Sequence, residues 1–337
     1  MPWYWTGIDF FEFVNTIAGM KYNSADGEDQ MPTYPRELAA DLKDGVVVPL
    51  VGAGLSIPSN LPTWPQLIEQ LLDELQSEDE VKRLRERFRE GSLGATAVPE
   101  LYALFKAKHS LLAFIKRKLG KAVVPNEYHR LVCDLRARTL LTTNFDNLIE
   151  DAHNARGQGV NKIWKNEQLA FYNEHQAVQV VKIHGTIEDI DTVVFSKSDY
   201  ETFKRDRILI YHFVATLFAT KTILFLGTSL NDLHLREIFE DVKARIDPAM
   251  RPHYALMNRP NPETRNVLRT YGIRSPRKFD PPLMELSCGI IWTLVSFNKS
   301  PGISSAIRLG HKRACGKRQR SALGSRSAPQ KFVGYAR

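Results

Sequence analysis

Small and polar residues follow five short apolar segments of this 337-residue chain, at the points where strands of a sheet would end. The carboxyl ends of parallel strands meet at one edge of a sheet, where open α/β sheets bind their ligands. We therefore expect a crevice for a polar ligand, with His184 as the group that can exchange a proton near neutral pH. The residues concerned are, in order of segment, Gly52, Ala53, Gly54 and Ser56; Thr143, Asn144 and Asp146; His184; Gly227, Thr228 and Ser229; and Asn258.

The first of these ends, Gly52-Ala53-Gly54, is typical of a turn that lets a phosphate group approach the backbone. The chain contains no G-x-x-x-x-G-K-[ST] segment, which excludes a P-loop. The dinucleotide fingerprint G-x-G-x-x-G also fails, because Ile57 stands where the third glycine belongs. Two interpretations stay open, a phosphate site and a tight turn needed only for packing. Thr63 and Gln66 then have capping-box spacing and predict the start of a helix.

The elements that would position these residues alternate between strands and amphipathic helices. Apolar runs predict strands, and the spacing of apolar residues predicts a helix over 232–246. This alternation indicates an α/β fold, a Rossmann-like parallel sheet with helices on both faces. A long helical stretch at about 78–137 is expected to form an inserted helical subdomain. The predicted strands are 46–51, 139–142, 178–183, 222–226 and 253–257.

The net charge of +8 is concentrated at one end of the chain. Residues 298–337 carry ten Lys or Arg and no Asp or Glu, so the remainder is close to neutral. We expect this basic tail to be flexible, either as a solvated extension or as a contact with an anionic partner such as nucleic acid. Residues 1–34 form an aromatic-rich extension, 35–280 the main domain, and 281–297 an apolar segment of uncertain structure.

Composition also limits the chemistry and the compartment. Three widely spaced cysteines, Cys133, Cys288 and Cys315, support neither a disulfide framework nor a cysteine-rich zinc ribbon. No histidine has metal-ligand spacing, so we expect no metal. The chain shows neither a secretory leader nor an apolar stretch long enough for a bilayer, and we expect a cytoplasmic protein without membrane contact.

The ordered set of strand ends resembles the sirtuin family over roughly residues 35–279. It is most similar to the bacterial, zinc-free branch of sirtuin-like domains that consume NAD in antiphage defence. The resemblance implies an NAD-binding domain that uses NAD as a substrate. The matching segments are Gly52-Ala53-Gly54-Leu55-Ser56, Thr142-Thr143-Asn144-Phe145-Asp146, His184-Gly185, Gly227-Thr228-Ser229 and Asn258.

Two departures from the deacylase pattern favour hydrolysis of NAD over lysine deacylation. The deacylases' G-I-P-D-F-R segment is here "NLPTW", residues 60–64, which lacks the acid and the arginine. The zinc ribbon that helps to form the acyl-lysine groove is absent from the sequence. The resemblance therefore implies an NAD glycohydrolase that releases nicotinamide and ADP-ribose, as the NAD-depleting effector of a defence system.

The chemistry of that reaction suggests a role for each residue. His184 can act as a base toward water or a ribose hydroxyl, and Asn144 can orient that group. Asp146 can accept a hydrogen bond from the ribose or nicotinamide, or favour positive charge in the sugar. The turn Gly52, Ala53, Gly54 and Ser56 would hold the pyrophosphate. Thr143, Gly227, Thr228, Ser229 and Asn258 complete the predicted nucleotide-binding set, with Gly227, Ser229 and Asn258 at the adenosine half.

Each role has a structural alternative. His184 could be a hydrogen-bonded structural residue, and Asn144 and Asp146 could cap a short helix at 147–152. Asp232 is expected to cap a helix rather than contact a ligand, and Trp64 to be a packing residue.

Other functions also stay open at this point. The chain could be a non-catalytic sensor of NAD or a related nucleotide, or an interaction subunit, and less readily a protein deacylase or ADP-ribosyltransferase. A homo-oligomer, a defence-system partner protein that controls activity, or both, are expected.

Overall fold

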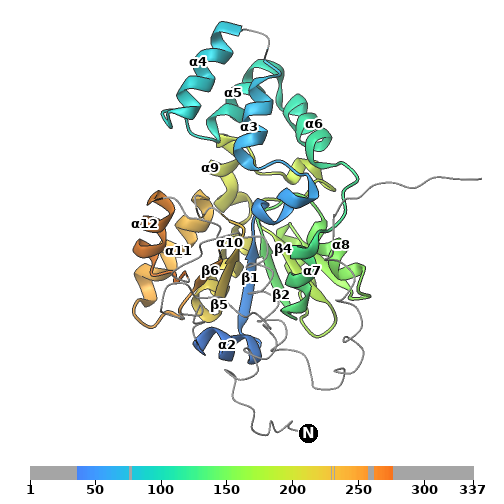
Figure 1. The fold of residues 1–337 in the computed structure, drawn as a ribbon, viewed down its shortest axis with the longest axis vertical. Coiled ribbons are helices and arrows are strands. Elements are labelled where there is room, and N and C mark those ends of the chain that lie inside the picture. The colour runs from blue at the N-terminus through green and yellow to red at the C-terminus, as the bar shows by residue number, and fades with distance from the viewer. Residues whose placement is uncertain (1–35, 76–77, 229, 231, 257–261, 276–337) are drawn as a thin grey trace, which may run out of the picture. The chain divides into compact units, whose positions relative to one another are not determined.

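The computed structural model describes residues 36–75, 78–228, 230, 232–256 and 262–275. Within these ranges the strands form one parallel sheet in the order β3-β4-β2-β1-β5-β6, with β1 between β2 and β5 (Figure 1). The strands are β1 Val47–Val51, β2 Thr139–Thr142, β3 Val160–Ile163, β4 Val178–Lys182, β5 Thr222–Leu226 and β6 Tyr254–Leu256.

Five of these six strands were predicted, each to within one residue at both ends. Strand β3 was not predicted. Its sequence, "VNKI", is short and half polar, and three of its four residues are only partly buried because it lies at the edge of the sheet. An edge strand needs no continuous apolar run, so it lacks the pattern that reveals the central strands.

Helices cover both faces of the sheet, which confirms the predicted Rossmann-like α/β class (Figure 1). In β1, Val48 and Leu50 pack against α10, α11 and α12, whereas Val47 and Val51 pack against α2, α7 and α8. This alternation follows from the period of two in a strand. The helices of the two layers are α2 Arg36–Lys43, α7 Glu127–Asp134, α8 Leu148–Asn154, α10 Ile208–Thr220, α11 Leu233–Ile246 and α12 Pro262–Tyr271.

A separate helical unit stands beyond the carboxyl ends of the strands (Figure 1). It comprises α3 Trp64–Leu72, α4 Glu78–Arg89, α5 Ala97–Lys106 and α6 Lys108–Leu119, and has its own apolar core. Phe145 and Phe195, from loops at the sheet edge, enter the same core. The helical unit therefore fixes the positions of loops that carry predicted site residues. Shorter elements complete the description: η1 Ala53–Ser59, η2 Asn166–Phe171, η3 Ile190–Thr192 and α9 Lys197–Asp206.

The predicted capping box at the start of α3 is confirmed. The Thr63 hydroxyl accepts a hydrogen bond from the Gln66 backbone N–H, and the Gln66 side chain accepts one from the Thr63 N–H at 2.8 Å. The helix predicted at 232–246 is observed as α11. These local signals hold because they depend on neighbouring residues alone.

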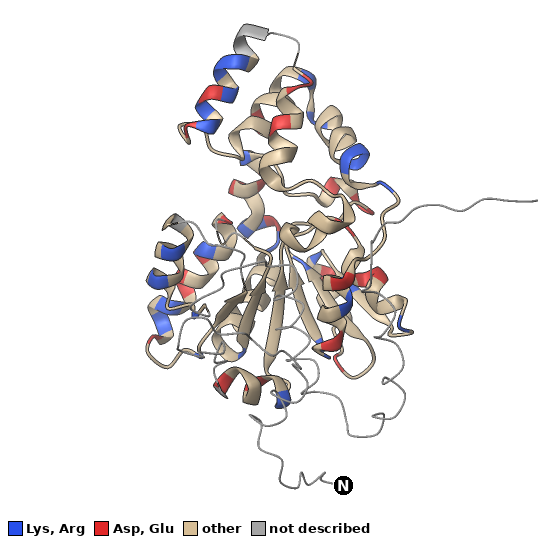
Figure 2. Ribbon diagram, viewed as in Figure 1, with Lys and Arg blue, Asp and Glu red and all other residues tan. Residues whose placement is uncertain are grey.

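Charged residues recur along α4 and on α11 and α12, as the colours of the ribbon in Figure 2 show. On α4, part of the positive charge is paired within the helical unit, because Arg85 and Arg89 bind Glu69 of α3 at 2.9 and 2.8 Å. These pairs fasten α4 to α3. Over the described ranges, every helix is too short or too polar to cross a membrane.

Because three histidines are buried in this fold, we expect acid to lower its stability. Burial lowers the pKa of His129, His184 and His253 to about 4, because the charged ring loses its hydration. In the unfolded chain a histidine has a pKa near ~6.5. As pH falls from ~6.5 to ~4, the unfolded chain gains protons that the folded chain does not, so we expect the free energy of unfolding to fall, by up to about 3 kcal/mol per histidine.

Urea denaturation between pH 7 and pH 4.5 measures this loss. His129→Phe removes one of the three groups and should make the dependence on pH shallower. A free energy of unfolding that stays level over this range would show that the histidines are not buried in the neutral form.

Candidate functional site

The Gly52-Ala53-Gly54 turn at the end of β1 lies against the turn that follows β5. The Gly52 N–H donates to the Leu226 carbonyl, and the Gly54 N–H donates to the Gly227 carbonyl, both at 2.9 Å. A Cβ added at Gly54 would lie 2.6 Å from the Gly227 carbonyl oxygen, which is closer than side chains approach backbone. Gly227 itself has a φ of +64°. The glycines therefore have a packing role, whether or not a ligand binds.

The backbone donors of this turn are partly used by the protein itself. In addition to the two glycine bonds, the Leu55 N–H donates to the Gly52 carbonyl at 3.1 Å. The turn is itself the start of the short 3₁₀ helix η1, which begins at Ala53 and in which the first N–H groups have no partner within the helix. Among those first-turn donors, Gly54 and Leu55 are bonded to protein carbonyls. An anion on this turn would depend on the Ala53 N–H or would have to replace existing bonds.

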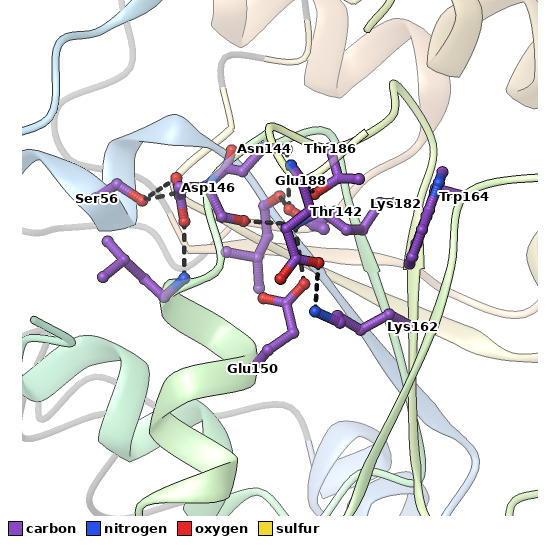
Figure 3. Close-up of polar contacts among 12 residues, drawn as sticks. Ser56, Thr142, Asn144, Asp146, Glu150, Lys162, Trp164, Lys182, Thr186 and Glu188 are labelled. Carbon is purple, nitrogen blue, oxygen red and sulfur yellow. Dashed lines mark hydrogen bonds and ion pairs between the residues drawn. The ribbon is translucent and has the colours of Figure 1, made fainter. Parts of the chain in front are cut away.

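Three predicted residues form one buried hydrogen-bonded group, the Ser56 network of Ser56, Asn144 and Asp146 (Figure 3). Ser56 Oγ donates to Asp146 Oδ2 at 3.0 Å, and Asn144 Nδ2 donates to Ser56 Oγ at 3.2 Å. The network joins the end of β1 to the end of β2. Residues 88 and 90 positions apart in sequence are thus brought into one polar cluster, at the edge where a ligand is expected.

The alternative capping role holds for Asp146 and does not hold for Asn144. Asp146 Oδ1 accepts from the Leu148 N–H at 3.1 Å, at the start of α8, while its other oxygen belongs to the Ser56 network. The Asn144 side chain binds Ser56 instead of a helix N–H. Asp146 therefore serves both the helix and the network.

Beneath this network lies an ion pair that sequence reasoning missed. Lys182, at the end of β4, is fully buried, and its ammonium group donates to the Asp146 carbonyl oxygen and, at 2.9 Å, to Glu150 Oε1 (Figure 3). Glu150 is buried as well. The pair fixes the backbone at Asp146 from below. A lysine within the apolar run "VVKI" was the available signal, because a charge in a central strand needs a partner.

The register of β2 with β4 places the turn that carries Asn144 next to the turn that carries His184. Thr142 of β2 pairs with Lys182 of β4, and each site residue lies two positions beyond its paired residue. Neighbouring strands run ~4.8 Å apart, so the two turns lie side by side. The turn after His184 is closed by a bond from the Val194 N–H to the His184 carbonyl at 2.9 Å.

The His184 side chain is buried against two aromatic rings, Tyr200 and Phe203, and two polar partners, His234 and Asp232. Its Nε2 atom lies 3.2 Å from Nδ1 of His234 and 3.6 Å from Oδ2 of Asp232. Burial lowers the pKa of His184 to about 4, and the Asp232 carboxylate opposes that shift. His184 is therefore neutral at pH 7 and has a ring nitrogen able to accept a proton.

Asp232 caps α11 as predicted, with Oδ1 accepting from the Leu235 N–H at 3.0 Å. Its other oxygen accepts from the Tyr200 hydroxyl at 3.1 Å and lies 3.6 Å from Nε2 of His184. His234 was not predicted at all. It follows Asp232 by two residues, and only the fold brings it to His184.

The other predicted residues differ in how the structure places them. The Thr143 N–H donates to the Val51 carbonyl at 3.4 Å, and Thr228 Oγ1 accepts from the Leu230 N–H at 3.3 Å. Both residues are half-buried. The predicted contacts at Ser229 and Asn258 lie outside the described residues. Trp64 packs against Phe195, with ring centroids 4.5 Å apart, which confirms its expected packing role.

A polar hollow of about 290 Å³ lies beside the loop that closes the His184 turn. Thr192, Val194 and Arg207 line it, and none of the Gly52 turn or the Ser56 network does. Arg207 also donates to the Ile183 carbonyl at 2.8 Å. The hollow is therefore distinct from the group of predicted residues.

The packing of the two glycine turns gives a first prediction for the site. Gly54→Ala should lower the melting temperature, by an amount that corresponds to about 1 to 3 kcal/mol, because the new methyl group meets the Gly227 carbonyl. Gly94→Ala is the matched control, since a Cβ there meets nothing within 4 Å. Equal melting temperatures for the two variants would contradict the close passage of the turns.

The buried ion pair gives a second prediction. Glu150→Ala should destabilise the fold by about 3 to 5 kcal/mol, because it leaves the Lys182 charge buried with no counter-charge. The double variant Glu150→Leu/Lys182→Met should be less destabilised than Glu150→Ala, since it removes both charges. Chemical denaturation of Glu150→Leu, Lys182→Met and their double variant measures the coupling, and additive effects would contradict a mutually dependent pair.

Comparison with known proteins identified several similar proteins. A family model described as a SIR2-like domain matches residues 138–275. The chain is 28% identical to NAD(+) hydrolase ThsA from Enterococcus faecium over 65% of this chain and 44% of that protein. It is 24% identical to defense-associated sirtuin 2 from Bacillus subtilis over 73% of this chain and 24% of that protein. The matched region thus spans less than half the length of either relative.

A solved structure described as a SIR2 homolog–NAD complex was also matched. It covers 80% of this chain and 95% of its own, at 14% sequence identity and a TM-score of 0.47.

Proposed function

We propose that this chain, whose residues 138–275 match a family model described as a SIR2-like domain, hydrolyses NAD at the nicotinamide–ribose bond. The observation that carries the proposal is that the carboxyl ends of neighbouring strands carry both the buried Ser56 network and a neutral buried histidine, His184. The names of the relatives, NAD(+) hydrolase ThsA among them, support it. The products are nicotinamide and ADP-ribose.

The reaction needs one base and no acid. The bond between nicotinamide nitrogen and ribose C1′ breaks, its electron pair leaves with nicotinamide, and nicotinamide departs as a neutral molecule. A water oxygen forms the new bond to C1′ and gives its proton to a ring nitrogen of His184. His184 suits this step because it is neutral at pH 7, and the nearby Asp232 carboxylate favours the protonated ring that results.

Asn144 is assigned to orienting the attacking water or a ribose hydroxyl. Its Nδ2 atom is already used by Ser56, so its amide oxygen is the atom that would accept from the water. Asp146, held by Ser56 and by α8, would favour the positive charge that develops on the sugar. Both roles require a fixed geometry, which the Ser56 network and the Lys182 ion pair supply.

The rest of NAD would extend along the ends of β1, β2 and β5. We assign the pyrophosphate to the turn of Gly52, Ala53, Gly54 and Ser56, where the Ala53 N–H is a first-turn donor of η1. The remaining assignments, Thr143, Gly227, Thr228, Ser229 and Asn258, complete the nucleotide site, with Gly227, Ser229 and Asn258 at the adenosine half.

The biological setting that we propose is antiphage defence, as the name of the Bacillus subtilis relative suggests. An NAD hydrolase that was always active would poison its own cell, so its activity requires control. We propose control through assembly, with a second copy or a defence-system partner protein. The extensions at 1–34 and 298–337, which lie outside the described residues, are the segments proposed for such contacts, and the basic tail for nucleic acid.

The roles of His184 and Asn144 can be tested together. His184→Ala and Asn144→Ala should each keep NAD bound and slow nicotinamide release by ~10² to 10⁴-fold, because they remove the base and the group that orients the water. The measurement is chromatographic separation of nicotinamide, ADP-ribose and cyclic ADP-ribose, with NAD affinity determined on the same samples under conditions in which the unmodified protein is active.

Thermal unfolding of both variants controls for loss of structure. If both stay folded and release nicotinamide at the unmodified rate, the catalytic assignment is wrong. Binding without turnover in the unmodified protein would instead favour a nucleotide sensor.

A further inference from the structure

We infer that His234 is a positioning residue that sets the tautomer of His184, so that Nδ1 of His184 is the nitrogen that accepts the proton. The catalytic consequence rests on the proposed function. The tautomer itself follows from the hydrogen bonds and can be measured in the absence of NAD.

The chain of bonds begins at a backbone carbonyl. Nε2 of His234 lies 2.9 Å from the Tyr200 carbonyl oxygen, which can only accept a hydrogen bond. Nε2 of His234 therefore carries a hydrogen. Burial also lowers the pKa of His234, so the ring is neutral and its Nδ1 atom is a bare acceptor.

That acceptor determines the state of His184. Nε2 of His184 lies 3.2 Å from Nδ1 of His234, and a hydrogen bond between two ring nitrogens contains one hydrogen. Because Nδ1 of His234 has none, Nε2 of His184 must be the donor. A neutral imidazole has a single N–H, which leaves Nδ1 of His184 with the lone pair.

Asp232 reinforces this assignment. Its Oδ2 atom lies 3.6 Å from Nε2 of His184, on the side of the ring that carries the hydrogen. The same oxygen accepts from the Tyr200 hydroxyl at 3.1 Å, which fixes the carboxylate. A second acceptor beside Nε2 favours the Nε2–H tautomer, and it also stabilises the ring once Nδ1 has taken a proton.

Aromatic stacking holds His234 in place. Its ring stacks on Tyr200, with centroids 4.3 Å apart and planes at 15°, and on Phe203, at 3.9 Å and 21°. Rotation of the His234 ring out of this stack would break both contacts and the bond to the Tyr200 carbonyl. Tyr200 thus contributes its carbonyl, its hydroxyl and its ring to the arrangement.

A metal ion is the competing use of the same residues. Donor atoms of His184, Asp232 and His234 all lie within 4.8 Å of one another, which is compact enough for a divalent cation. In that case Nε2 of His184 would carry a lone pair toward the ion rather than a hydrogen. The two arrangements therefore predict opposite protonation at one atom.

The first test determines whether Nε2 of His184 carries a hydrogen. In protein labelled with ¹⁵N-histidine, two-dimensional NMR at pH 7 should report the Nε2–H tautomer for both His184 and His234. His234→Phe and His184→Ala assign the two signals. An Nδ1–H tautomer at His184 would overturn the inference. So would a stoichiometric metal ion found by elemental analysis, if the His184 signals shift when a chelator removes that ion.

The second test separates positioning from packing. His234→Phe keeps an aromatic ring for the stack and loses the acceptor, whereas His234→Asn can place an amide oxygen near the position of Nδ1. We expect kcat for nicotinamide release to fall about 10²-fold in His234→Phe with KM for NAD unchanged, and to recover largely in His234→Asn.

His129→Phe is the matched control for this pair. It makes the same change at a second buried histidine, on α7, and should leave kcat and KM unaltered. If the unmodified protein does not hydrolyse NAD, the proposed function fails while the tautomer result stands. If it does hydrolyse NAD and folded His234→Phe keeps the unmodified kcat, the positioning role is wrong.

Discussion

The pairing of β1 with β2 on one side and β5 on the other is the constraint on which the rest of the site depends. It brings the Gly52 turn against the Gly227 backbone, with hydrogen bonds of 2.9 Å between the two chain segments. It also places Ser56 near the end of β2, where the Ser56 hydroxyl forms hydrogen bonds with Asp146 and Asn144. The central position of β1 thus brings the Gly52 turn to Gly227 on one side and Ser56 to Asp146 and Asn144 on the other.

A buried ion pair holds the backbone of the site in place. Lys182 and Glu150 form a pair beneath the Asp146 backbone, and the ammonium group also binds the Asp146 carbonyl. Desolvation of such a pair is costly, so its net effect on stability is small compared with the cost of losing one partner. What the pair supplies is a fixed position for the turn that presents Asn144 and Asp146.

Sequence patterns predicted the central strands and their polar ends because each central strand is buried on both faces and therefore reads as an apolar run. They did not predict β3, whose edge position permits polar residues. Sequence patterns did not reveal the roles of Lys182, Glu150 and His234 for another reason. The role of each residue depends on a partner that is 32 or 50 residues away in sequence. The glycine turn was predicted with two interpretations open, and the structure shows that packing accounts for the glycines by itself.

Burial and the Asp232 carboxylate have opposite effects on the pKa of His184, and their balance suits the proposed role of His184 as a general base. Burial keeps the ring neutral, which makes its lone pair available at pH 7, but burial also disfavours the protonated ring that the proposed reaction would form. Asp232 offsets that second effect from 3.6 Å without ionising the resting ring. In the proposed reaction, departure of neutral nicotinamide would leave positive character on the sugar, so a weak base would suffice to take a proton from the attacking water. A strongly basic histidine would instead be protonated at rest, and would present a positive charge to a substrate whose reacting ring is already cationic.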